Sequence, residues 1–143
     1  MSALLGFQVL LYEFNLRINP ADSSVRGWAQ ITLLPSADTS WLNLADDLSV
    51  DSVLVNGARV SFWRRGDTLL FPTPAETCSV KVFYGGVPSN GLHFFSKSFY
   101  AQGEYRVARN WLPVPDTPSA KAPVKLAATV PAGWTLLANG TLD

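Results

Sequence analysis

The chain has 143 residues and a formal net charge of +0; 48% of its residues are apolar and only 15% are charged. Roughly a quarter of the residues are charged in a typical soluble domain, so this composition predicts one folded domain and excludes a disordered chain. One Cys and one His cannot build a disulfide framework or a usual His/Cys zinc site. The balanced charge and the lack of a basic stripe argue against a nucleic-acid partner.

The first residues of the chain resemble neither a signal peptide nor a membrane span. Apolar residues recur within residues 3–11, but no Lys or Arg precedes them and no small-residue cleavage site follows. No stretch of the sequence approaches the roughly 18 apolar residues of a transmembrane helix. We therefore expect no membrane segment, a strand over residues 7–18, and a cytoplasmic protein.

Alternation of apolar and polar residues predicts strands along most of the chain. Asn56-Gly57 between two short apolar runs is a strong hairpin signal, and Gly85-Gly86 is expected to break the run before it. No window carries a helical stripe. The predicted strands, in chain order, are residues 7–18, 27–34, 41–44, 50–55, 60–63, 68–71, 80–84, 124–130 and 134–138, with a turn at 64–67.

Short strands separated by Gly- and Pro-rich turns predict an all-β fold. The ten Gly and ten Pro lie mostly between the predicted strands. We expect a two-sheet β-sandwich that is mostly antiparallel. No internal repeat or linker divides the chain, so residues 1–143 are predicted to form a single domain.

Residues 91–121 lack a clear period and are rich in Gly, Pro, Asn and Asp. Pro and turn residues fix a backbone without a ladder of hydrogen bonds. A long segment of this kind in a small β domain is often a binding loop. A structural crossover between two sheets explains the same composition equally well.

Within this segment, Gln102-Gly103-Glu104 is followed by Ala108-Arg109, Pro113 and then Asp-Thr-Pro-Ser-Ala-Lys at residues 116–121. This order resembles the N-terminal domain of the aminopeptidase N-like zinc metallopeptidases, which include the leukotriene hydrolase branch. Their pattern runs Gln-x-Glu, Ala-Arg, Pro-x-x-Asp-x-Pro-x-x-Lys, then a strand and Asn-Gly. The first predicted strand, residues 53–57 and residues 130–140 continue the similarity, which covers essentially the whole chain. The family often has Pro-Cys where this chain has Pro-Val at 113–114.

The resemblance implies a saddle-shaped β domain that packs on a thermolysin-like catalytic domain, where His-Glu-x-x-His and a distal Glu hold zinc. Neither that motif nor the family's Gly-x-Met-Glu-Asn strand occurs in the 143 residues. We therefore expect a truncated, non-catalytic N-terminal domain that hydrolyses nothing alone, with a zinc-dependent aminopeptidase as the parent protein. The alternative is a free-standing β-sandwich that acts as an interaction or ligand-binding module.

The resemblance also implies that Gln102 and Glu104 bind substrate at the active site of the neighbouring domain. Glu104 matches the Glu that binds the free α-ammonium of a peptide, and Gln102 matches a residue of the first side-chain pocket. A carboxylate facing an ammonium forms a short charge-assisted hydrogen bond. In an extended loop, residues i and i+2 project to the same side. The alternative for Glu104 is an ordinary ion pair with Arg106 or Arg109.

Other residues of this segment are expected to be structural. Arg109 and Asp116 are expected to pair and brace the loop, and Lys121 to bind Asp116 or a backbone carbonyl. The lone His93, beside two Phe residues, is expected to be a packing residue. Two further residues are expected to fix the loop backbone: Pro113 and Pro118.

The low charge fraction also predicts a surface for a partner. We expect an apolar face that the catalytic domain covers in the parent protein. When this domain is isolated, the same face is expected to cause self-association.

Overall fold

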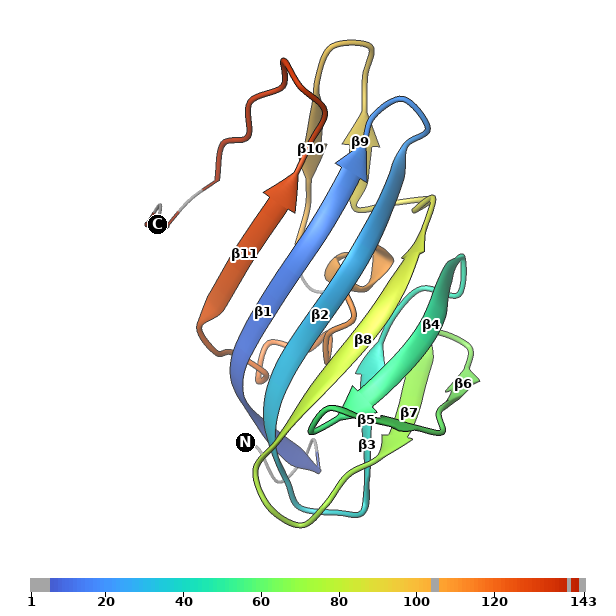
Figure 1. Ribbon diagram of the computed structural model, residues 1–143, viewed down its shortest axis with the longest axis vertical. Coiled ribbons are helices and arrows are strands. Elements are labelled where there is room, and N and C mark those ends of the chain that lie inside the picture. Colours follow the sequence, from blue (N-terminus) through green and yellow to red (C-terminus); the bar gives the residue numbers. More distant parts are fainter. Residues whose placement is uncertain (1–5, 104–105, 139, 142–143) are drawn as a thin grey trace.

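The computed structural model describes residues 6–103, 106–138 and 140–141. Within these ranges the chain forms strands β1 to β11 and a short 3₁₀ helix, η2, and none of these residues forms a helix long and apolar enough to cross a membrane (Figure 1). The bounds are β1 (Phe7–Asn19), β2 (Ser24–Pro35), β3 (Thr39–Asn43), β4 (Leu48–Val55), β5 (Ala58–Val60), β6 (Trp63–Arg65), β7 (Thr68–Pro72), β8 (Cys78–Gly86), β9 (Leu92–Phe94), β10 (Phe99–Ala101), η2 (Ala108–Asn110) and β11 (Val124–Thr129).

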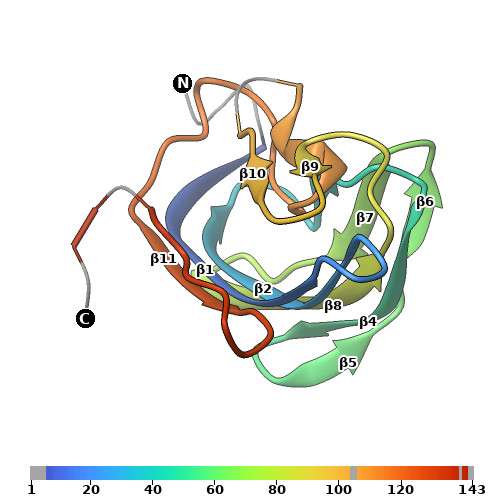
Figure 2. The same cartoon turned by 90° about the horizontal axis from the view of Figure 1, so that it is seen from above.

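Six strands form the main sheet, in the order β11-β1-β2-β8-β4-β5. Neighbouring strands are antiparallel except β1 and β11, which are parallel and pair from Tyr12 opposite Val124 to Arg17 opposite Thr129. The sheet is strongly curved, so its strands wrap around an interior (Figure 2). The predicted all-β and mostly antiparallel architecture is confirmed.

A second layer covers the concave face of this sheet. It consists of a three-stranded sheet in the order β3-β7-β6, the hairpin of β9 and β10, and the irregular segment around η2 (Figure 2). Asn43 at the end of β3 bridges to Val114, which joins the small sheet to that irregular segment. The two layers together are consistent with a β-sandwich.

The core lies between the two layers. Its residues come from alternate positions along the strands, which place their side chains on one face of the sheet. Along β1 the residues from Tyr12 to Ile18 alternate between buried and more accessible positions, as the alternation of apolar residues predicts. Each fully buried Leu, Val or Phe contributes about 1.5–3 kcal/mol to folding relative to an exposed one. The largest fully buried side chains are Tyr84, Phe7, Phe71, Leu16, Ile31, Leu33, Leu42, Leu44, Leu48, Leu69, Val25 and Val53.

The hairpin of β1 and β2 brings two backbones into unusually close contact at Gly27. Gly27 has φ +152° and pairs with Leu16. A Cβ atom here would overlap the carbonyl oxygen of Asn15 and lie 3.0 Å from the Cα of Leu16. Only glycine fits this position, because both obstacles are backbone atoms that cannot move aside.

Four local predictions differ from the structure. The strand predicted over residues 60–63 is interrupted, because β5 ends at Val60 and β6 begins at Trp63. Gly85 and Gly86 do not break the strand before them: both belong to β8 and pair with β2 and with β4. Residues 134–138 do not form the predicted strand. The predicted turn at 64–67 is shorter, because Arg64 and Arg65 belong to β6. The two-residue hairpin at Asn56-Gly57 is confirmed, with positive φ at both residues.

Candidate functional site

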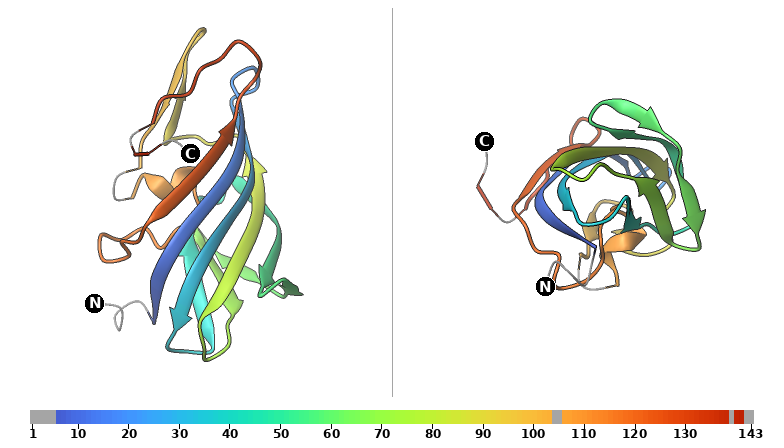
Figure 3. Two further views of the ribbon diagram at one scale, coloured as in Figure 1. Left: turned by 60° about the vertical axis from the view of Figure 1, so that its left-hand side comes forward. Right: turned by 90° about the horizontal axis from the view of Figure 1, so that it is seen from below.

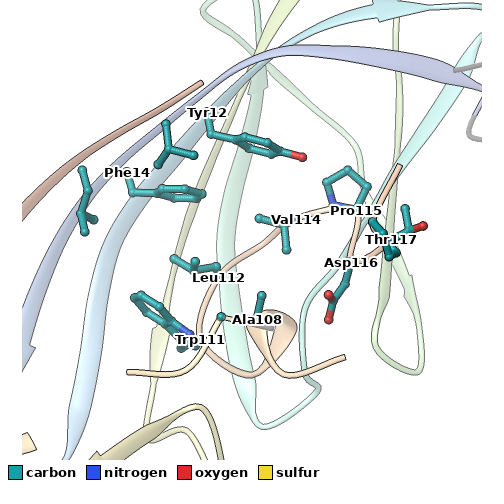
Figure 4. Close-up of a pocket in the computed structure, with 13 residues that line it drawn as sticks. Tyr12, Phe14, Ala108, Trp111, Leu112, Val114, Pro115, Asp116 and Thr117 are labelled. Atoms are coloured by element: carbon teal, nitrogen blue, oxygen red, sulfur yellow. The ribbon is translucent and has the colours of Figure 1, made fainter. Parts of the chain in front are cut away.

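The candidate site is the irregular segment from Gln102 to Pro118 and the apolar hollow beneath it. Figure 4 shows Tyr12 and Phe14 of β1 directed towards this segment, with Leu112 and Val114 facing them across the hollow. The hollow has a volume of about 400 Å³. A larger hollow of about 880 Å³ lies beside it, between β10, the end of β11 and residues 133–138. Trp111 and Leu126 line both hollows, which therefore lie next to each other and are together called the apolar groove.

Gln102 is anchored at the start of the segment. Its backbone N–H donates to the Gly91 carbonyl at 2.7 Å, and its own carbonyl accepts from the Trp111 indole Nε1 at 2.7 Å. Its side-chain Oε1 lies 2.7 Å from His93 Nε2. A carbonyl oxygen can only accept, so His93 carries a proton on Nε2 in this contact. His93 therefore orients the Gln102 side chain, a role beyond the packing role predicted for it.

Glu104, the other residue predicted to bind substrate, lies outside the described residues. Gly103 is exposed, and among the described residues beyond its chain neighbours no atom lies within 4 Å of the position a Cβ would take there. Hydrogen bonds therefore fix Gln102, whereas the next residue in the sequence, Gly103, has open space around it.

Asp116 organises the second half of the segment. This carboxylate is 7% exposed. Its Oδ1 accepts from the Arg106 backbone N–H at 3.0 Å, and its Oδ2 accepts from Arg109 through the backbone N–H at 3.3 Å and Nε at 3.0 Å. The Asp116 N–H donates to Asn43 Oδ1 at 3.1 Å. The buried carboxylate therefore closes the turn around η2, and the backbone N–H of the same residue joins this turn to β3.

Arg109 extends this bracing to the small sheet. Its Nη1 lies 2.9 Å from Asp67 Oδ2, in the turn between β6 and β7.

Pro113 is buried and Pro118 is exposed. Lys121 is exposed, and neither of the contacts predicted for it, with Asp116 or with a carbonyl, occurs among the described residues.

Two buried tyrosines tether the same segment to the main sheet. Tyr84 OH donates to the Trp111 carbonyl at 2.7 Å, and Tyr12 OH donates to the Ala120 carbonyl at 2.6 Å. Burial raises the pKa of both phenols. The sequence predicts both tyrosines only as core residues of strands. An alternating pattern of apolar residues does not show which group a tyrosine hydroxyl will bind.

Replacing Tyr84 by Phe is expected to lower the free energy of unfolding by about 1–2 kcal/mol, because the buried Trp111 carbonyl loses its donor. The folded-state pKa of Tyr84 lies above that of the unfolded chain. Stability from the neutral phenol is thus present below about pH 10 and falls as pH rises beyond it. Urea unfolding from neutral to alkaline pH checks both effects, and the variant should show a smaller alkaline loss than the wild type.

The matched control is Tyr100→Phe, since Tyr100 is 51% exposed. This control should leave both the urea midpoint and its alkaline slope unchanged. Equal behaviour of the two variants would contradict the tether assigned to Tyr84.

The described part of the chain has no group of three or more His, Cys, Asp or Glu that could hold a metal ion. It offers an apolar groove, an oriented amide at Gln102 and a braced loop.

Solved structures with the same fold include an M1 zinc metallopeptidase and a leukotriene A4 hydrolase. The M1 zinc metallopeptidase from Deinococcus radiodurans matches with a TM-score of 0.79 and 24% identity, over 89% of this chain and 33% of that one. A mutant of that enzyme bound to a Tyr-Ser-Ala substrate gives a TM-score of 0.80 at 24% identity, with the same coverage. The leukotriene A4 hydrolase from yeast gives 0.79 at 20% identity, over 92% of this chain and 24% of that one.

No family model and no curated protein matches the sequence. The chain therefore has the fold of one part of these enzymes, and it spans between a quarter and a third of their length. The predicted resemblance to the N-terminal domain of such metallopeptidases is confirmed at the level of the fold.

Proposed function

We propose that this chain is the non-catalytic N-terminal domain of a zinc-dependent aminopeptidase. In this role it packs on a catalytic domain and supplies residues that bind the N-terminus of a peptide substrate. The observation that carries the proposal is the shared fold, which covers 89% of this chain but only 33% of an M1 zinc metallopeptidase. The Gln102-Gly103-Glu104 sequence adds the residue types that such a role needs.

The anchoring of Gln102 supports a binding role for the loop that follows. Three hydrogen bonds, to Gly91, His93 and Trp111, fix its backbone and its amide. A binding group on a preorganised support loses less conformational entropy when its ligand arrives. Glu104 follows Gln102 by two residues in the sequence, so the same loop carries a carboxylate shortly after the oriented amide.

The chemistry assigned to Glu104 is recognition of a chain end. A carboxylate and an α-ammonium form a charge-assisted hydrogen bond, which is shorter and stronger than a neutral one. Fixing the ammonium positions the first peptide bond of the substrate relative to the reacting groups, which lowers the entropic part of the barrier. The metal and the general base would belong to the catalytic domain.

The test is Glu104→Gln in the longer protein that carries this domain and a catalytic domain. Loss of a hydrogen bond to a charged group costs about 1.5–3 kcal/mol, so kcat/KM for peptides with a free N-terminus should fall about 10–100-fold. The matched control is Glu76→Gln, an exposed carboxylate in the loop between β7 and β8, which should not change kcat/KM.

Two outcomes would contradict the proposal. Peptide hydrolysis by the purified 143-residue chain supplied with zinc would overturn its non-catalytic role. An unchanged kcat/KM for Glu104→Gln would remove the substrate-binding role while leaving the fold assignment in place.

The open apolar groove favours a second candidate, a free-standing module that binds a ligand or a protein. Such a module would act without a catalytic domain. The longer reading frame separates the two candidates: His-Glu-x-x-His and Gly-x-Met-Glu-Asn motifs beyond residue 143 support the first, and their absence supports the second.

A further inference from the structure

One face of the hairpin formed by β9 and β10 carries a row of aromatic rings. The tip of this hairpin lies at one end of the molecule (Figure 3, left). Tyr100 stands opposite His93 in the register of the two strands. Because successive side chains of a strand point to opposite faces, His93 and Phe95 share one face with Tyr100 and Gln102. We call the rings of His93, Phe95 and Tyr100 the aromatic ladder.

The rings of the aromatic ladder are stacked on one another. The centroids of His93 and Tyr100 lie 4.6 Å apart with an interplanar angle of 22°. Those of Tyr100 and Phe95 lie 6.1 Å apart with an angle of 18°. Phe95 is 59% exposed and Tyr100 is 51% exposed. Single exposed apolar side chains are ordinary on a protein surface, but a contiguous group of them indicates a contact surface.

The opposite face of the hairpin supplies its packing against the domain. The ring centroids of Phe94 and Phe99 lie 5.5 Å apart there, and the ring of Phe99 lies 5.8 Å from that of Trp134. Both Phe residues pack against the hydrophobic core. The aromatic ladder is therefore not needed to hold the hairpin in place.

The aromatic ladder ends at Gln102, a residue of the proposed substrate site. His93 connects the two, because its Nε2 lies 2.7 Å from Gln102 Oε1 while its ring stacks on that of Tyr100. In an extended segment the Cα atoms of residues i and i+2 are about 6.6 Å apart. An aromatic side chain can reach a neighbour at such a distance. A substrate side chain that contacts Gln102 can therefore also contact the ring of Tyr100.

We propose that Tyr100 and Phe95 bind the side chain of the first residue of the peptide substrate, and that they select an aromatic one. The assignment rests on the proposed function, because it takes Gln102 as part of the substrate site. The substrate ring stacks on Tyr100, and Phe95 extends the contact for larger rings. His93 is a positioning residue here, since it holds both the Gln102 amide and the Tyr100 ring.

The charges of the hairpin favour a neutral ring over a cation. The face of an aromatic ring also attracts Lys and Arg side chains. Residues 91–102, however, contain no Asp or Glu and one Lys, Lys97. A cationic side chain on the aromatic ladder would approach this like charge, and the hairpin has no carboxylate to offset the repulsion. An aromatic side chain gains an offset-stacked contact without this repulsion.

The test measures selectivity in the longer protein that carries this domain and a catalytic domain. The substrates are the p-nitroanilides of L-phenylalanine and L-alanine, and we expect a higher kcat/KM for phenylalanine. Tyr100→Ala should reduce the ratio of the two values about 3–10-fold, the size of one lost aromatic contact. It should do so by lowering the phenylalanine value alone. Tyr100→Phe keeps the ring and should keep the ratio.

The matched control is Trp63→Ala, which removes a 45% exposed ring on β6 and should leave the ratio unchanged. Circular dichroism and the urea midpoint establish that each variant is folded. The p-nitroanilide of L-arginine tests recognition of a cation. If Tyr100→Ala lowers kcat/KM for arginine more than for phenylalanine, the assigned class of side chain is wrong.

An unchanged ratio in Tyr100→Ala would overturn the proposal. An equal fall for phenylalanine and alanine would also overturn it, because that result is expected of rings that only pack on the catalytic domain. Glu104→Gln separates this failure from that of the proposed function: loss of the ammonium contact should lower kcat/KM for both substrates and leave their ratio unchanged. The absence of a catalytic domain from the longer reading frame would overturn both.

Discussion

Replacing Gly27 by Ala is expected to destabilise the domain more than any other conservative change. The added Cβ would overlap the Asn15 carbonyl oxygen and lie 3.0 Å from the Leu16 Cα, at a residue with φ +152°. Relief requires the separation of β1 from β2 near the turn that joins them. We expect a loss of more than about 4 kcal/mol, which is exceptional for one substitution and a large part of the 5–15 kcal/mol that holds a typical domain together. Thermal melting should show a fall in Tm of more than about 10 °C.

The matched control is Gly103→Ala. In the described part of the chain, no atom beyond its chain neighbours lies within 4 Å of a Cβ at Gly103, and its φ is outside the positive region. This variant should stay within about 0.5 kcal/mol of the wild type, as surface substitutions usually do. Similar melting temperatures for the two variants would show that the close approach of β1 and β2 is not a constraint on the fold.

Replacing Asp116 by Asn is expected to lower the free energy of unfolding by about 2–4 kcal/mol. The amide keeps the size of the side chain but loses the charge that pairs with Arg109 and binds the N–H groups of Arg106 and Arg109. Breaking a buried ion pair costs about 3–5 kcal/mol. The smaller value expected here reflects the remaining contact of Arg109 with Asp67. Hydrogen exchange should also become faster around η2, because this turn loses the carboxylate that closes it.

Asp67→Asn is the control for this prediction. It removes the other carboxylate bound to Arg109, but the Asp67 side chain is 46% exposed. Exposed ion pairs contribute about 0–1 kcal/mol. Chemical denaturation of both variants therefore separates a buried bracing residue from a surface pair. Equal losses in the two variants would contradict the central position of Asp116.

The parts of the fold that the sequence predicts are those decided by local pattern. Alternation identified β1, β2 and β8, since one face of each strand meets the core. It also identified β11, although no residue of that strand is buried. Asn56-Gly57 identified its hairpin because both residues readily adopt positive φ. The hairpin of β9 and β10 was missed, because consecutive aromatic residues at 93–95 hide a period of two.

The parts that failed depend on neighbours distant in the sequence. Residues 134–138 have the composition of a strand, but a strand needs a partner edge, and none pairs with them in the described residues. Gly85 and Gly86 read as a strand break, yet they lie where β8 is paired on both sides. A single glycine pair cannot signal whether the chain turns there or passes close to another backbone.

The candidate site also combines features that a local pattern predicts with features that depend on residues distant in the sequence. Arg109 and Asp116 are seven residues apart and their opposite charges suggested a pair, which the structure contains. Asp67 lies 42 positions from Arg109, and nothing local connects the two. The bonds from Tyr12 and Tyr84 likewise depend on how the segment crosses the sheet. The substrate-binding role of Gln102 and Glu104 stays a prediction.

The parallel pairing of β1 with β11 also has a consequence for how the chain is made. β1 is synthesised before β11, and the partner Val124 follows Tyr12 by roughly 110 positions. At about 5–20 residues per second, a ribosome needs about 5–20 s to supply that strand. During this interval the hairpin of β1 and β2 can form, but the far side of β1 has no strand to bind. Contacts so distant in sequence also slow folding, so β11 is the closing strand, and the nascent domain is most vulnerable to mispairing just before it is added.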